Sequence, residues 1–85
     1  METLELLLKH YNFRPFIPLE EAGSLWGHTA KTMKEKIDAG DIRLPYFTPD
    51  GKQKSVKLVR VETVAQILDK RASEADREFA KLWSS

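Results

Sequence analysis

Prolines and glycines divide residues 1–60 of this chain into short segments, and this division limits the fold to small helices and short strands. Pro15 interrupts the first apolar segment, Gly27 and Gly40 end the next two, and the turn "TPDG" at residues 48–51 separates two extended stretches. A chain of 85 residues has room for one domain with one modest core. We therefore expect a single small domain.

Three helices are expected before Gly40. Residues 3–12 place apolar side chains at i, i+3, i+4 and i+7, which describes one face of an amphipathic helix. Pro18 suits the first position of a second helix that ends at Gly27, and Thr29 can cap a third that runs to about residue 39. Two short helices joined by a tight glycine-containing turn form a helix-turn-helix pattern. The apolar positions are Leu4, Leu7, Leu8 and Tyr11; then Leu19, Ala22, Leu25 and Trp26; then Ala30, Met33 and Ile37.

A β-hairpin is expected after the helix pair. The stretch "IRLPYF" (42–47) alternates and is rich in β-forming residues, and Pro45 marks it as an edge strand or an irregular one. After the turn, "KQKSVKLVRV" (52–61) resumes an extended pattern. Helix, turn, helix and hairpin is the chain order of a winged helix, in which the second helix of the pair enters the major groove of DNA. We predict an α+β, mostly α, winged helix-turn-helix with a long C-terminal helix.

Positive charge gathers at this hairpin. Residues 43–60 hold five basic residues and one acidic residue, a net +4, whereas the whole chain carries a formal charge of +1. A basic patch on an otherwise neutral domain favours a polyphosphate partner such as double-stranded DNA. The alternative is a solvated lysine-rich edge that protects the strands from aggregation, and charge alone does not separate the two. The candidate contacts are Lys52, Lys54 and Lys57 in the wing, and Lys31, Thr32, Lys34 and Glu35 on the polar side of the third helix.

A heptad seam runs through the last part of the chain. Its members are spaced 4, 3, 4, 3, 4 and 3 residues apart, as on a helix that packs along one stripe. We expect the folded core to cover about residues 3–71, with Val64 and Ile67 packing on it, and residues 72–85 to form a helical extension. The extension is a candidate for self-association, and the alternative is that it folds back on the helix of residues 3–12. The seam is Val61, Ala65, Leu68, Ala72, Ala75, Phe79 and Leu82, of which the last four form the self-association candidate.

The chain also resembles the pyocin activator (PrtN) family of small phage- and prophage-associated transcription activators, from about Thr3 to Arg71. The resemblance rests on "TLELLLKHY", "RPFIPLE", "AGDIRLP", "QKSVKLV" and "LDKR" in this order. It implies a sequence-specific DNA-binding activator with a winged, MerR- or excisionase-like helix-turn-helix. By position, Gln53, Lys54 and Ser55 match the polar stretch of the wing, and Thr29 matches the start of the recognition helix. The base-reading face, with Lys31, Thr32 and Glu35, departs from the family, so the operator sequence does not carry over.

Enzymatic and metal chemistry find no support in the sequence. His10 and His28 lack sequence-local carboxylates, and we expect a structural role for the first and a solvent-facing turn for the second. No glycine-rich phosphate loop or nucleophile motif is present, and without cysteine there are no disulfides or thiolate sites. Tyr46 and Phe47 could stack on single-stranded bases, but their place on a strand favours core packing.

We expect a DNA-binding transcriptional regulator without cofactor or metal, and an activator of a phage or bacteriocin-like operon. The alternatives are an excisionase-like architectural protein and a protein-interaction module that uses the hairpin and the C-terminal helix. The expected partners are double-stranded DNA, RNA polymerase and further copies, as a homodimer or a cooperative array on DNA. No apolar run is long enough to span a membrane, and the first residues lack the pattern of a signal peptide, so a cytoplasmic location is expected.

Overall fold

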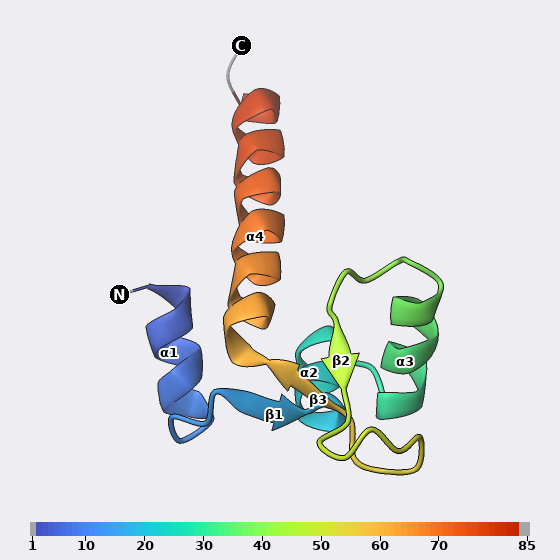
Figure 1. Ribbon diagram of the computed structural model, residues 1–85. Helices are drawn as coiled ribbons and strands as arrows, with labels where there is room; N and C mark the ends of the chain where they lie inside the picture. Colours follow the sequence, from blue (N-terminus) through green and yellow to red (C-terminus); the bar gives the residue numbers. More distant parts are fainter. Residues whose placement is uncertain (1, 84–85) are drawn as a thin grey trace.

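The computed structural model describes residues 2–83, which form four helices and a small three-stranded sheet (Figure 1). The predicted class, α+β and mostly helical with a long C-terminal helix, is confirmed. Residues 84–85 of the predicted extension lie outside the described residues. In chain order the elements are α1 (Thr3–His10), β1 (Phe16–Pro18), α2 (Leu19–Trp26), α3 (Ala30–Asp38), β2 (Tyr46–Phe47), β3 (Leu58–Arg60) and α4 (Val61–Trp83).

The sheet has the order β1-β3-β2, with both neighbours antiparallel to β3. Val59 at its centre lies opposite Ile17 on one side and Tyr46 on the other. The predicted hairpin is therefore confirmed, but its strands are much shorter than the extended stretches on which it was based. Pro45 cannot donate to the ladder, and the loop between the strands folds on its own hydrogen bonds instead of pairing.

The first helix ends earlier than predicted. It stops at His10, and Asn12 and Phe13 then take left-handed backbone conformations with φ of 57° and 61°. Two such residues in succession turn the chain before Pro15 is reached. The turn leads directly into β1. The Val61 N–H donates to the Pro15 carbonyl at 3.0 Å, and this hydrogen bond holds the residue before β1 against the start of α4.

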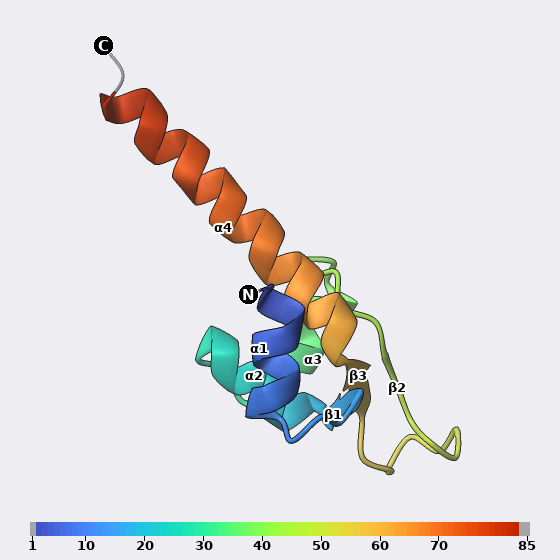
Figure 2. The same ribbon diagram turned by 90° about the vertical axis from the view of Figure 1, so that its left-hand side faces the viewer.

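The core lies between the sheet and the four helices. Ile17, Met33 and Val59 are fully buried, so the sheet and α3 contribute to the same cluster. The start of α4 contributes as well, and α1 packs against that part of α4, as Figures 1 and 2 both show. The further buried members are Tyr11, Leu19, Ala22, Ile42, Leu44, Val61 and Val64.

The heptad seam along α4, called the stripe below, is covered by the domain in the first half of the helix and exposed in the second half. Val64 is buried and Ile67 packs against the core, as predicted, and the Thr3 hydroxyl donates to Asp69 at the far end of the α1 contact. Beyond that level the helix leaves the domain, and the molecule reaches 54 Å in its longest direction (Figures 1 and 2). The alternative in which the extension folds back on residues 3–12 is wrong, because α1 covers only the first half and Phe79 is 63% exposed. Among residues 2–83, no helix is long and apolar enough to cross a membrane.

Candidate nucleic-acid interface

The turn between α2 and α3 brings the two helices into close contact. Gly27 ends α2 with φ of 74°, and the His28 N–H then donates to the Gly23 carbonyl at 2.9 Å. A Cβ added at Gly23 would lie 2.8 Å from both the His28 carbonyl oxygen and the Met33 Cγ. Gly23 therefore permits the approach of α3, and the buried Met33 side chain anchors it there.

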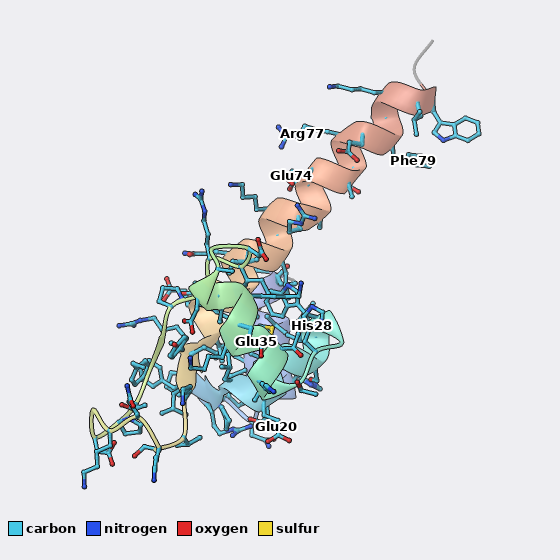
Figure 3. The ribbon with its side chains drawn as sticks, turned by 90° about the vertical axis from the view of Figure 1, so that its right-hand side faces the viewer. Glu20, His28, Glu35, Glu74, Arg77 and Phe79 are labelled. Carbon is cyan, nitrogen blue, oxygen red and sulfur yellow. The ribbon has the colours of Figure 1, made fainter. Side chains whose placement is uncertain are left out.

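Thr29 caps α3 as predicted. Its hydroxyl oxygen accepts from the Thr32 N–H at 3.2 Å, which satisfies one of the free donors at the start of the helix. The two threonine hydroxyls also lie 3.1 Å apart, so the Thr32 side chain belongs to the cap. Lys31 and Glu35 are both exposed, and Glu35 lies on the surface of α3 that faces the viewer in Figure 3.

Asp38 joins the end of α3 to the first strand of the hairpin. Its Oδ2 accepts from Lys34 Nζ at 2.7 Å, and its Oδ1 accepts from the Tyr46 hydroxyl at 2.8 Å. The hydrogen bond from Lys34, followed by that from Tyr46, holds the pKa of Asp38 below its ordinary value, and the same contacts raise the pKa of both donors. Sequence reasoning missed this link, although Lys34 and Asp38 have the i, i+4 spacing of a helical ion pair.

The wing is the loop of residues 48–57 between β2 and β3. Its single acidic residue, Asp50, accepts from the Lys52 N–H at 3.0 Å and from the Ser55 hydroxyl at 2.7 Å. The Ser55 hydrogen bond, and then the Lys52 amide, lower the pKa of the Asp50 carboxyl. Asp50 therefore folds the loop internally, while the side chains of Lys52 and Lys54 stay exposed.

The remaining predicted wing residues take part in the fold of the loop. Lys57 Nζ donates to the Gln53 carbonyl oxygen at 3.1 Å, which closes the loop before β3 begins. Gln53 is exposed, and the Ser55 hydroxyl is turned inward to Asp50. Of the predicted contacts in the wing, Lys52, Gln53 and Lys54 thus present the most accessible side chains, whereas Ser55 acts on the loop itself.

Two adjoining grooves separate α3 from the wing. The first is lined by Lys31, Lys34 and Lys57, together with Glu20 at the start of α2, and the second by Lys34, Lys57 and Lys52. Lys34 and Lys57 line both grooves and lie where the two grooves meet. Among the described residues, the lining of these grooves includes four lysines and one carboxylate, Glu20, and the Asp38 carboxylate pairs with Lys34, so the lysines outnumber these two carboxylates by two. The helix and the wing, separate in the sequence, thereby share one positively charged surface.

The aromatic pair after Pro45 divides between core and surface. Tyr46 packs partly against the core, as expected, whereas Phe47 is 41% exposed and core packing is wrong for it. Successive side chains of a strand point to opposite faces of the sheet, so Phe47 lies on the outer face while Tyr46 faces the core. There the Phe47 ring meets the Phe16 ring edge-on at 5.4 Å.

The two histidines lie in different parts of the fold, and His28 directly precedes Thr29, the cap of α3. The His10 ring packs edge-on against Tyr11 at 4.7 Å, and His28 lies partly buried in the turn between α2 and α3 (Figure 3). Within residues 2–83, no group of three or more histidine or carboxylate side chains is arranged to hold a metal ion.

One comparison with known proteins gives a match. The family described as Pyocin activator protein PrtN matches residues 3–75, which is most of the chain and includes α3, the wing and the first half of α4. The match extends a few residues beyond the resemblance that the motifs define, into the start of the helical extension. No curated protein and no solved structure matches the chain significantly.

Proposed function

This chain belongs to the pyocin activator PrtN family, whose members are transcriptional activators and not enzymes, and we propose that it activates transcription by binding a specific double-stranded DNA site through α3 and the wing. The family supports the activator role. The lysine surface that α3 and the wing share supports DNA binding through these two elements.

The observation that carries the proposal is the position of the lysines around the two grooves. An α-helix fits the major groove of B-DNA, and the phosphates on its edges then lie within reach of side chains beside the helix. Lys52 and Lys57 approach from the wing and Lys34 from α3, so phosphates would be contacted from both sides. If the lysines served only to keep an exposed strand soluble, they would need to lie on that strand, but they would not need to face α3 across a groove.

Sequence would be read by the first turn of α3. Thr29 begins this helix, and Lys31 is exposed one residue inside it, where a recognition helix offers side chains to base edges. Thr32 and Glu35 complete the polar surface next to Lys31. The link from Asp38 to Tyr46 would keep this surface in a fixed relation to the wing.

A footprint on the DNA that flanks its own gene tests the proposal. We expect a protected site that survives heparin competition, and a promoter reporter that rises with the intact protein but not with a Lys52→Ala/Lys54→Ala/Lys57→Ala variant. RNA polymerase would be the further partner at such a promoter. Activity in an excision assay without reporter activation would favour an architectural role instead. Absence of a protected site on any DNA tested, with a folded protein, would reject DNA binding by this surface.

A further inference from the structure

The second half of α4 exposes large apolar side chains. Phe79, Leu82 and Trp83 are 63%, 81% and 75% exposed, and the rings of Phe79 and Trp83 lie 5.9 Å apart. Phe79 projects from a different side of the helix than Glu74 and Arg77 (Figure 3). A cluster of this kind on a small domain marks an interaction surface more often than it is accidental.

These residues continue a stripe that is covered in the first half of the helix. Val61 and Ala65 are buried, and Leu68 packs against the core, whereas Ala72 and Ala75 are exposed on the same stripe. Within the described residues, nothing covers the second half. The 3-4 spacing nevertheless persists through Leu82, as expected of a helix that packs on another helix.

We propose that this stripe, formed by Ala72, Ala75, Phe79 and Leu82, binds the same stripe of a second copy in antiparallel orientation. The two-fold axis would pass at the level of residue 77. Positions 72 and 82 lie equally far from that level, and so do 75 and 79. Ala72 therefore faces the partner's Leu82, and Ala75 faces the partner's Phe79.

The sizes of the facing side chains set this direction. In the antiparallel pair every layer combines an alanine with a large apolar residue, so all four layers have similar volume. A parallel pair would place Phe79 against Phe79 and Ala72 against Ala72. The Phe79 layer would then be overfilled and the Ala72 layer would leave a gap, and both defects would lower the stability of the pair.

Charges on one edge of the stripe fit a second copy of the chain. Arg71 and Glu78 are seven residues apart and flank the stripe on the same side. In the antiparallel pair the two copies of Glu78 lie near the axis, and each copy of Arg71 lies about 7.5 Å along the helix from the partner's Glu78. A long arginine side chain spans this distance, so two arginines neutralise two carboxylates. Arg71 is 78% exposed and its own-chain contact with Glu74 is long, at 3.4 Å, so its guanidinium is accessible.

The opposite edge of the stripe carries an unfavourable charge in this arrangement. The two copies of Asp76 would approach each other beside the axis, without a basic residue at the neighbouring flanking positions 69 and 83. A parallel pair would instead place Asp76 beside the partner's Arg71, which is attractive. Side-chain volume therefore decides the direction, and the repulsion between the Asp76 carboxylates limits the affinity.

The overlap needed for this pair lies entirely outside the folded domain. Residues 71–83 span about 20 Å of helix, and the partner's domain would lie beyond the opposite end, so the two domains do not collide. Such a short helix pair is smaller than a standard stable interface of about 1,600 Å². We therefore expect association to be weak and to rise with protein concentration.

Engineered cysteines test the pairing and its direction, because the chain contains no cysteine of its own. One preparation carries Ala72→Cys and another carries Leu82→Cys. In the antiparallel pair two copies of the first cysteine lie about 15 Å apart along the axis, too far for a disulfide. We expect covalent dimers on oxidation of the mixture and none from either preparation alone. Dimers from each preparation alone would overturn the antiparallel register, and no dimers from any combination would overturn self-association through this stripe.

Phe79→Asp provides a second test, with Ser73→Asp as the matched control because both add one negative charge to the exposed half of α4. Sedimentation should show loss of the concentration-dependent dimer for Phe79→Asp only. At a concentration low enough for both variants to be monomers, their melting temperatures should agree, since Phe79 does not contact the core. A lower melting temperature for Phe79→Asp without a change in mass would mean that the stripe packs on its own chain and would reject the proposal.

Changes of the flanking charges separate the antiparallel pair from the parallel one. Asp76→Asn should strengthen association, because it removes the repulsion between the two carboxylates, whereas in a parallel pair it would remove an attraction to Arg71. Arg71→Glu should weaken association, because four carboxylates would then share one edge. The double variant Arg71→Glu/Glu78→Arg should restore it. Weaker association of Asp76→Asn, or failure of the double variant to restore the dimer, would contradict the antiparallel arrangement.

Discussion

The Tyr46 hydroxyl donates a hydrogen bond to Asp38 Oδ1 at 2.8 Å, and this contact connects the last turn of α3 to the strand that leads into the wing. Lys34 donates to the other oxygen of the same carboxylate at 2.7 Å. One side chain therefore holds both a lysine of the proposed DNA surface and the strand that positions the wing. The geometry of that surface depends on a contact between elements that are independent in the sequence.

Removal of the link should weaken DNA binding more than it weakens the fold. Tyr46→Phe removes the hydrogen bond between α3 and β2, and Asp38→Asn removes the charge and leaves one side-chain oxygen to accept from both Lys34 and Tyr46. The contact is solvent-exposed and contributes little to stability. We expect a several-fold loss of affinity for the specific site in a titration, with a melting temperature close to that of the parent. Asp41→Asn is the control, because it removes one nearby negative charge without touching the wing. Equal affinities of Asp38→Asn and Asp41→Asn would contradict the proposed role of the link.

The pH dependence of the link follows from its pKa shifts. The hydrogen bonds from Lys34 and Tyr46 depress the pKa of Asp38 below the ordinary 3.8, so its contribution is present above that value and is lost as the pH falls through the lower, folded pKa. The pKa of Lys34 and that of Tyr46 are raised above 10.5 and 10.0, so their contributions are lost only as the pH rises through still higher values. The link should thus persist across the neutral range. A carboxyl titration by NMR should place the pKa of Asp38 below 3.8 and move it upward in Tyr46→Phe; a midpoint at or above 3.8 in the parent would contradict the contact.

Local signals predicted the helices well. Thr29 as the cap of α3 and Gly27 as the end of α2 depend on backbone conformations set by one or two residues. Pro18, predicted as the first residue of the second helix, is instead the extended residue before it and the last residue of β1, with ψ of 145°. The sheet was less predictable, because β1 joins β3 across about forty residues of sequence and its three residues carry no signal of that partner. The wing strands were predicted too long, since the pattern of β-forming residues does not reveal where the loop forms its own hydrogen bonds.

The candidate surface was predictable as a set of residues but not as an arrangement. The charge excess at residues 43–60 identified the wing, and the polar side of the third helix identified Lys31 and Lys34. That Lys34 lines the grooves together with Lys57, and is held by Asp38, follows from tertiary packing alone. Gly23 provided one local signal that sequence reasoning left unused, because an isolated glycine inside a helical pattern often marks a close approach.

Gly23→Ala should destabilise the helix-turn-helix. The added methyl group would stand 2.8 Å from the His28 carbonyl oxygen and from Met33 Cγ, and the carbonyl belongs to a tight turn that cannot easily move. We expect a loss of about 1–3 kcal/mol in the free energy of unfolding, as for other overpacked sites. Ser24→Ala, at the next and exposed position, should change it by no more than about 0.5 kcal/mol. Equal denaturation midpoints for the two variants would show that α2 and α3 are not as close as described.

Replacement of the wing lysines should reduce the salt dependence of DNA binding. Lys52 and Lys54 have exposed side chains, and removal of each phosphate contact should flatten the slope of log K against log salt by roughly 0.9. The double variant Lys52→Ala/Lys54→Ala should therefore weaken binding to all sequences alike. Lys81→Ala on the distant part of α4 is the control and should leave the slope unchanged. An equal slope for the wing variant and the control would mean that the wing lysines do not contact phosphates and only keep the exposed edge soluble.

Substitutions in α3 should separate sequence reading from phosphate contact. Lys31 is exposed in the first turn, so Lys31→Ala should change which DNA sequence is preferred, at about 1–3 kcal/mol for each base contact removed. Thr32→Ala should act in the same way. It removes the contact between the two threonine hydroxyls but keeps the hydrogen bond from the Thr32 backbone N–H to the Thr29 hydroxyl, which caps the helix. Lys34→Ala should lower affinity for specific and random DNA equally, since Lys34 lies beside the wing and not at the start of the helix. Selection from a random DNA library with each variant measures preference directly. If all three variants recover the parent's preferred sequence, the first turn of α3 does not read the bases.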